Sequence, residues 1–76
     1  MRARIFTPDG EYQATLVNAT LQSAVEAAGE GGYVYIDDVF FHVNGGVPEP
    51  MDPYTAHDMG LYGKAVTAER AAAAAH

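Results

Sequence analysis

Cysteine is absent from this chain of 76 residues, so neither a disulfide framework nor a thiolate metal cage can form. Cations are scarce as well: four lysines and arginines face ten aspartates and glutamates, and the formal net charge is −6. Proteins that bind nucleic acids need a basic footprint to displace counterions from the phosphates. We therefore expect no direct nucleic-acid partner.

Long apolar runs are missing too. No window approaches the roughly 18 apolar residues of a membrane span. The segment Met1–Phe6 is basic, but no apolar stretch of signal-peptide length follows it. We therefore expect no membrane partner and a cytoplasmic location, which means the host cytoplasm or the virion if the protein is viral.

Catalytic motifs are missing in the same way. The single serine, Ser23, lies within a predicted helix with no histidine predicted near it. The glycine pairs Gly31–Gly32 and Gly45–Gly46 lack the following lysine and Ser/Thr of a phosphate-binding loop. A chain this short also rarely forms the cleft that acid–base catalysis needs. We expect a protein that is not an enzyme and binds no cofactor.

Three histidines, His42, His57 and His76, are the remaining candidates for a metal site. Zinc sites use three or four converging ligands. The one alternative is a metal site on a loop, formed by His57 with the neighbouring Asp58 and the nearby Asp52. We expect no metal.

Turn residues Pro8–Gly10 separate two segments with strand character, residues 2–7 and 11–17. Proline presets φ for the first turn position and glycine accepts a left-handed backbone, which together favour a hairpin. With Thr7 opposite Glu11, six side chains share one side of this hairpin: Arg2, Arg4, Phe6, Tyr12, Ala14 and Leu16.

A helix that runs to about Ala28 is predicted next. Its apolar residues recur at i, i+3, i+4 and i+7 and form one stripe: Leu21, Ala24, Val25 and Ala28. Thr20 or Asn18 can cap its start, and Gly29 suits its C-terminal end.

The strongest strand signals are Tyr33–Ile36 and Val39–Val43, with Asp37-Asp38 as a two-residue turn between them. This register pairs Ile36 with Val39, Tyr35 with Phe40, Val34 with Phe41 and Tyr33 with His42. Side chains alternate across a strand, so one face is aliphatic and should pack on the helix: Val34, Ile36, Val39, Phe41 and Val43. The other face is aromatic: Tyr33, Tyr35, Phe40 and His42.

Glycines and prolines predict a loop over Asn44–Tyr54. Thr55 then caps a C-terminal helix, with Asp58 three residues further on. Its apolar stripe is thin: Met59, Tyr62 and Val66. The alanine-rich end, Ala71–Ala75, has almost nothing to bury.

These elements predict an α+β fold, a two-layer sandwich in which one helix crosses a face of an antiparallel ββαββ sheet, plus a C-terminal helix. Residues 1–54 form the ββαββ part and residues 55–76 the helix. Two arrangements remain open. The helix either folds back over the aromatic face or reaches outward to a neighbouring molecule.

The sequence Tyr35-Ile36-Asp37-Asp38, between apolar strands, resembles the palm motif of reverse transcriptases, in which paired aspartates of a hairpin turn hold catalytic magnesium. The resemblance implies metal-dependent nucleotide transfer, which requires a further carboxylate and a template channel. It covers four residues of a chain that is too short for a polymerase and too acidic to hold a template. We therefore interpret both aspartates as residues of a solvated turn.

The aromatic face is the best candidate for binding a protein partner, because tyrosines bring rigid area with a polar tip. The predicted partner-binding residues are Tyr33, Tyr35, Phe40 and His42, with Asp37 and Asp38 at the turn. The alternative is a second core layer beneath the C-terminal helix. Either strand of the hairpin is also a candidate sheet edge, open to strand addition.

Two functions follow from these expectations. The first is a small structural or assembly subunit of a larger complex such as a phage virion, which includes self-assembly into an oligomer. The second is a small acidic inhibitor of a host complex. It is similar to ββαββ anti-CRISPR proteins in element order and acidity, and an immunity or regulatory module belongs to the same class.

Overall fold

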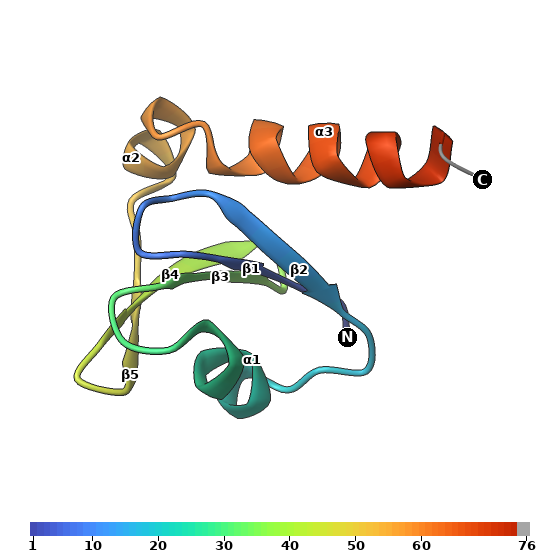
Figure 1. Cartoon of the computed structure of the whole chain (residues 1–76). Coiled ribbons are helices and arrows are strands. Elements are labelled where there is room, and N and C mark those ends of the chain that lie inside the picture. The colour runs from blue at the N-terminus through green and yellow to red at the C-terminus, as the bar shows by residue number, and fades with distance from the viewer. Residues whose placement is uncertain (75–76) are drawn as a thin grey trace.

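The computed structural model describes residues 1–74, so Ala75 and His76 of the predicted C-terminal segment lie outside the described residues. The elements are β1 (Ala3–Phe6), β2 (Tyr12–Leu16), α1 (Leu21–Ala28), β3 (Tyr33–Ile36), β4 (Val39–Asn44), β5 (Val47–Pro50), α2 (Pro53–Asp58) and α3 (Leu61–Ala74). The strands form one antiparallel sheet in the order β2-β1-β3-β4-β5. The α+β class is confirmed, with α1 across one face and the C-terminal helices across the other (Figure 1).

The β3–β4 hairpin has the predicted register at all four pairs, from Tyr33 opposite His42 to Ile36 opposite Val39. Asp37 and Asp38 have φ values of 54° and 64°. Positive φ at both central positions is the geometry of a type I′ turn, whose twist matches that of the flanking strands, and aspartate tolerates this region better than most residues. The predicted two-residue turn is confirmed.

The β1–β2 hairpin contains a bulge that the sequence did not reveal. Phe6 pairs with Tyr12 as predicted, but the register then shifts and Gln13 is an extra residue. One inserted residue exchanges the two faces for everything beyond it. The prediction that Ala14 and Leu16 share a face with Tyr12 is therefore wrong, and Leu16 packs against the core on the α1 side.

The predicted loop Asn44–Tyr54 is wrong in its first half, because it contains the edge strand β5 (Val47–Pro50). Gly45 and Gly46, with φ of 62° and 76°, form the turn into it. Pro48 and Pro50 lie opposite β4 residues at positions that alternate with the hydrogen-bonded pairs. Their missing N–H groups would point to the free side of the sheet, so the pairing tolerates both prolines.

The α1 side of the sheet holds the aliphatic core. Its buried residues come from β1, β3, β4 and the start of α1: Ala3, Ile5, Ala19, Ala24, Val25, Val34, Ile36 and Val43. Thr20 and Ser23 form a reciprocal capping box at the helix start, in agreement with the predicted cap. Of the predicted aliphatic face, Val39 at the start of β4 stays exposed.

The C-terminal segment forms two helices, α2 and α3, where a single one was expected. The predicted cap at Thr55 is wrong: the side chain of Asp52 accepts a hydrogen bond from the Tyr54 N–H, and Pro53 takes the first helical position. Gly60, with φ of 70°, interrupts the helical conformation and separates the two helices.

This break changes which side chains face the sheet. Ala56, Leu61 and Ala65 are buried there together with Phe6 of β1, whereas Tyr62 of the predicted stripe is half-exposed. In a single helix the same periodic positions would face the sheet along its whole length. Because Gly60 interrupts the helix, the set of positions that face the sheet starts anew at Leu61. The sheet thus lies between two helical layers.

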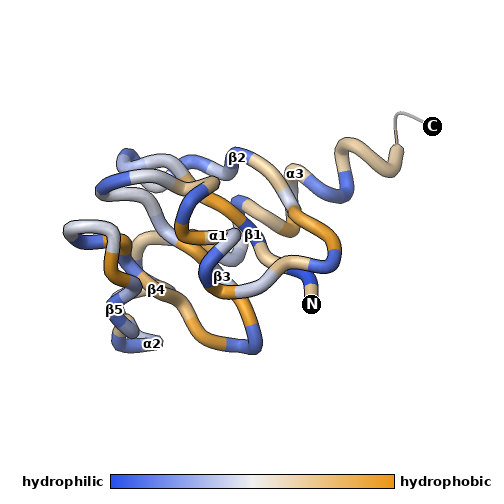
Figure 2. The backbone as a smooth tube through the Cα atoms, turned by 90° about the horizontal axis from the view of Figure 1, so that it is seen from below, coloured by the Kyte–Doolittle hydropathy of each residue, from blue (hydrophilic) through white to orange (hydrophobic). Residues whose placement is uncertain are grey.

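The most hydrophobic stretches of the chain lie mainly in the strands, whereas α3 combines weakly hydrophobic stretches with hydrophilic ones (Figure 2). Within residues 1–74, no helix combines the length and the apolar character that crossing a bilayer requires.

Candidate partner-binding groove

A row of side chains crosses the sheet on the side of α2 and α3. Cross-strand pairs place Thr15, Arg4, Tyr35 and Phe40 side by side on four successive strands. At the end of the row, the Met51 N–H donates to the Phe40 carbonyl at 2.8 Å. Residues directly opposite in a sheet lie close enough for their side chains to touch. Tyr35 therefore has a cation on one side and a phenylalanine ring on the other.

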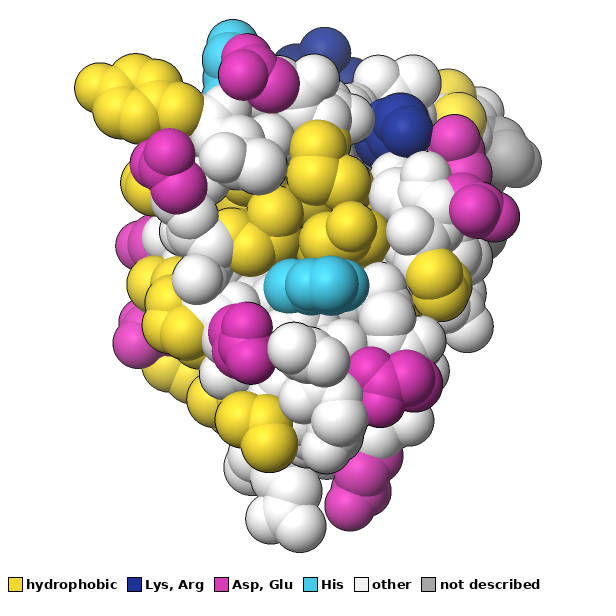
Figure 3. All heavy atoms as spheres, turned by 90° about the vertical axis from the view of Figure 1, so that its left-hand side faces the viewer, with side chains coloured by type: hydrophobic (Ala, Val, Ile, Leu, Met, Phe, Trp, Pro, Cys, Tyr) yellow, Lys and Arg dark blue, Asp and Glu magenta, His cyan; other side chains and the backbone are white. Residues whose placement is uncertain are grey.

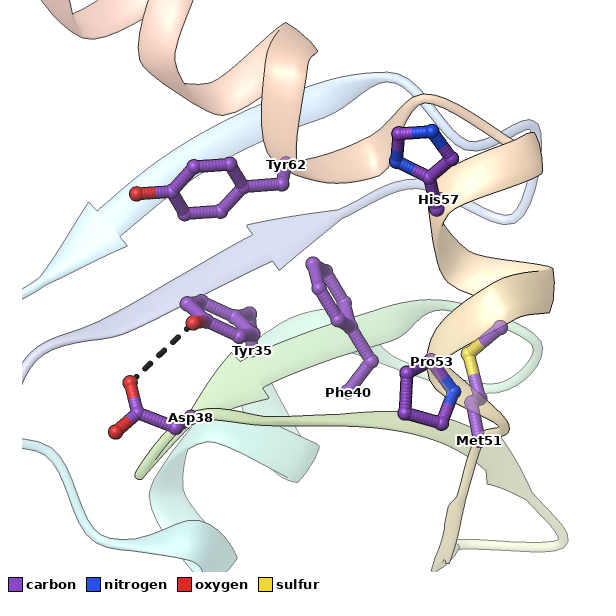
Figure 4. Close-up of a pocket in the computed structure, with 7 residues that line it drawn as sticks. All are labelled: Tyr35, Asp38, Phe40, Met51, Pro53, His57 and Tyr62. Carbon is purple, nitrogen blue, oxygen red and sulfur yellow. Dashed lines mark hydrogen bonds between the residues drawn. The ribbon is translucent and has the colours of Figure 1, made fainter.

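Two residues of this row, Tyr35 and Phe40, border a groove of about 290 Å³. Seven residues line it: Tyr35, Asp38, Phe40, Met51, Pro53, His57 and Tyr62. Figure 4 shows Tyr62 and His57 on the helical side and Tyr35 and Phe40 on the sheet side. Asp38 lies at one end, and Pro53 and Met51 lie at the other. We call this site the aromatic groove.

Three aromatic rings form the walls of the aromatic groove. The rings of Tyr35 and Phe40 have centroids 4.3 Å apart at 33°, and those of Tyr35 and Tyr62 are 5.6 Å apart at 72°. Both distances lie near or within the range of favourable aromatic pairs. Tyr62 is nevertheless 50% exposed. The pairing fixes the Tyr62 ring against Tyr35 while leaving much of its surface open.

Arg4 occupies the other side of the two tyrosines. Its Cζ lies 5.6 Å from the Tyr35 ring centre and 5.8 Å from that of Tyr62, within the range of cation–π attraction. Its Nε donates a hydrogen bond to Glu69 Oε1 at 2.6 Å. That hydrogen bond raises the pKa of Arg4 and lowers the pKa of Glu69, so both groups stay charged.

Glu69 collects further partners from the sheet. The Thr15 hydroxyl donates to its Oε1 at 3.3 Å, and Arg2 Nη2 lies 3.8 Å from its Oε2. Since Glu69 belongs to α3 while these partners belong to β1, β2 and the N-terminus, one carboxylate ties the helix to the sheet.

Asp38 closes the other end of the row. The Tyr35 Oη donates a hydrogen bond to Asp38 Oδ1 at 3.3 Å. Burial of the ring raises the pKa of Tyr35, and the neighbouring Asp38 charge and this hydrogen bond raise it further. Tyr35 therefore remains a neutral donor, and its hydroxyl holds the Asp38 carboxylate beside the aromatic groove.

Three of the six predicted partner-binding residues line the aromatic groove: Tyr35, Phe40 and Asp38. Tyr33 and His42 lie further along the same sheet face and stack on each other, with centroids 4.8 Å apart at 19°. Asp37 is exposed at the turn and does not line the aromatic groove.

The aromatic face is both core and surface. Tyr33, Tyr35 and Phe40 pack around the buried Phe6 and Leu61 and are themselves only partly buried. The C-terminal helices therefore cover this face without closing it. The hairpin offers no sheet edge for strand addition, contrary to one expectation, because β1 flanks β3 and β5 flanks β4.

Sequence reasoning missed four groove residues: Met51, Pro53, His57 and Tyr62. The sequence predicts Tyr62 in the apolar stripe of a single helix. The break at Gly60, which the helical periodicity does not show, leaves its ring half-exposed instead. The alternative of a loop-borne metal site included His57 and Asp52 as candidate ligands. In the structure, His57 lines the aromatic groove, whereas Asp52 caps α2. Residues 1–74 hold no group of three or more metal-ligating side chains.

The charges of the chain are unevenly distributed. Arg2 and Arg4 pair with Glu69, and Lys64 pairs with Glu11. On the side shown in Figure 3, one histidine ring borders a central apolar patch, and the charged side chains around it are mostly carboxylates. Within residues 1–74, the aromatic groove is lined by a carboxylate and by no lysine or arginine.

We compared the chain with protein-family models, with curated proteins and with solved structures, and found no match.

Proposed function

We propose that this chain is a non-catalytic protein-binding protein that serves as a small subunit of a larger assembly such as a phage virion. The observation that carries the proposal is the aromatic groove, an open surface in which a half-exposed Tyr62 is held against Tyr35. Pre-ordered tyrosine rings with polar tips favour protein contacts, because little side-chain freedom is lost on binding.

The end of α3 supports a place in an assembly. Its last buried residue is Ala65, and Arg70–Ala74 are exposed. In Figure 1 this end of the helix extends beyond the sheet. An alanine-rich helical end gains little from its own domain, and contact with a neighbouring subunit would bury it. The virion or the host cytoplasm is the location that fits this role.

A stand-alone inhibitor of a host complex is the second candidate, and the surface charge favours it. Arg2, Arg4 and Lys64 are engaged by two carboxylates, Glu69 and Glu11, and within residues 1–74 the other acidic groups form no salt bridge and can attract a basic partner. The same pairing supports our proposal that nucleic acid is not a direct partner.

The oligomeric state of the isolated chain in solution distinguishes the assembly subunit from the inhibitor. Size-exclusion chromatography with light scattering should give a defined oligomer or a larger particle for an assembly subunit. A stable monomer over a wide concentration range would contradict the assembly role and favour the inhibitor.

Substitution in the aromatic groove tests protein binding itself. In a pull-down from the native source, Tyr62→Ser should lose the proteins that the unchanged chain captures, since it removes the exposed ring. Val17→Ser is the matched control, because Val17 is 72% exposed and belongs to no groove wall. Equal capture by both variants would show that the aromatic groove is not the contact surface.

A further inference from the structure

We propose that the aromatic groove binds an arginine side chain presented by a basic partner protein. This inference rests on the protein-binding function proposed above and specifies the chemistry of the partner at the same site. It follows from three features of the structure: the environment of Arg4, the position of Asp38 and the charge around the aromatic groove.

Arg4 shows what the two groove tyrosines accept. Its guanidinium lies within 6 Å of both ring centres while its Nε donates to a carboxylate, Glu69. A flat guanidinium can stack on a ring and bond a carboxylate at once, which the compact ammonium of lysine does less well. Tyr35 and Tyr62 thus already form one wall of an arginine site inside the molecule.

The aromatic groove presents components of the same kind to the solvent. Its lining includes the rings of Tyr35, Tyr62 and Phe40, and Asp38 at one end supplies a carboxylate (Figure 4). An ionised carboxylate has about four acceptor positions, and the only hydrogen bond to the Asp38 carboxylate within residues 1–74 comes from the Tyr35 hydroxyl. Room therefore remains for the paired N–H groups of a guanidinium.

Charge complementarity selects a basic occupant. Within residues 1–74 no lysine or arginine lines the aromatic groove, and its lining includes the carboxylate of Asp38. The net charge of −6 attracts a basic protein over a long range.

Three short blocked peptides test the proposal on the full chain: acetyl-Gly-Xaa-Gly-amide with arginine, lysine or citrulline at the central position. Citrulline keeps the planar shape of arginine without its charge. Titration followed by ¹H–¹⁵N NMR should show shifts for the arginine peptide that cluster at Tyr35, Asp38, Phe40 and Tyr62. Equal binding of the lysine or citrulline peptide would overturn the assignment to arginine.

Two neighbouring carboxylates provide a matched pair of variants. Asp38→Asn should weaken arginine-peptide binding about threefold to fivefold, because it removes the carboxylate that bonds the guanidinium. Asp37→Asn removes the same charge one residue away, outside the groove lining, and should change binding by less than about twofold. Asparagine accepts the positive φ of both positions, so both variants should keep the turn. Equal effects of the two variants would contradict a specific contact.

Failure of this inference is distinguishable from failure of the proposed function. If no peptide shifts the groove resonances while Tyr62→Ser still abolishes partner capture, the arginine assignment is wrong and protein binding stands. If Tyr62→Ser and Val17→Ser capture the same proteins, the proposed contact surface is wrong as well.

Discussion

Gly32 lies where the chain leaves α1 and enters β3, pressed against the backbone of two other elements. A Cβ placed on it would lie 2.7 Å from the Ala28 carbonyl oxygen and 2.9 Å from that of Phe6. Backbone atoms cannot rotate away as a side chain can, so only a shift of α1 or β1 would relieve the contact.

We expect Gly32→Ala to lower the free energy of unfolding by about 2–3 kcal/mol, as overpacked core positions do. Gly63→Ala is the matched control. A Cβ on Gly63 of α3 meets nothing within 4 Å, and alanine should raise stability by about 0.5–1 kcal/mol in a helix. Urea denaturation followed by circular dichroism measures both changes. A neutral Gly32→Ala would show that the α1–β3 junction yields more easily than its geometry indicates.

At the scale of elements, α3 is held to the sheet by the ion pair between Glu69 and Arg4. We expect Glu69→Gln to lower the free energy of unfolding by about 1 kcal/mol at pH 7, because it leaves a partly buried guanidinium without its charged partner. Glu11→Gln is the control. Glu11 pairs with Lys64 on the surface, where ion pairs contribute little.

The effect of Glu69→Gln should depend on pH. The hydrogen bond from Arg4 lowers the folded-state pKa of Glu69 below the ordinary glutamate value of 4.5. The stabilisation by the Glu69–Arg4 ion pair is then fully present above pH 4.5 and is lost as the pH falls through the lowered pKa of the folded state. Between these two pKa values, only the unfolded state binds the proton of Glu69. Thermal melts of both proteins should therefore converge in acid. A difference between the two proteins that stays constant however far the pH is lowered would contradict the ion-pair explanation.

The elements differ in how far the sequence determines them. The β3–β4 register follows from local rules, since a two-residue turn at Asp37–Asp38 and strict alternation leave one pairing. The bulge at Gln13 has no such signature, because an extra residue is selected by what each face packs against. The prolines of β5 signal a loop by themselves, and only an edge position in the sheet makes them acceptable in a strand.

The candidate groove is predictable only in its sheet half. Tyr35, Phe40 and Asp38 follow from the hairpin alone. His57 and Tyr62 reach the aromatic groove because Gly60 turns the chain between α2 and α3, next to the point where Leu61 joins Phe6 in a buried cluster. A contact between distant segments of this kind is not encoded in any local pattern.

At the scale of the whole molecule, one sheet joins two cores through β1. Ile5 belongs to the aliphatic core under α1, and the adjacent Phe6 belongs to the aromatic core under α2 and α3. Small domains usually unfold in one step when their parts share such an element. The two layers should therefore be lost together.

Substitutions of equal size on the two sides test this cooperativity. Ile5→Val and Leu61→Val each remove one buried methylene and should each cost about 1 kcal/mol. The aromatic core includes Tyr12, Tyr33 and Tyr35, while Tyr54 and Tyr62 belong to α2 and α3, so tyrosine fluorescence reports on that layer. We expect fluorescence and far-ultraviolet circular dichroism to give coincident transitions in both variants. A fluorescence transition that moves alone in Leu61→Val would show that the layers unfold separately.

The two prolines of β5 also bear on how the chain behaves at high concentration. Val47 and Glu49 direct their N–H groups at β4, and the alternate residues of the strand, Pro48 and Pro50, have no N–H group to direct outward. This stretch of the sheet edge therefore offers acceptors without donors. A strand from another molecule cannot build a ladder on it, so the chain is protected on this side from the edge-to-edge stacking that begins amyloid-like aggregation.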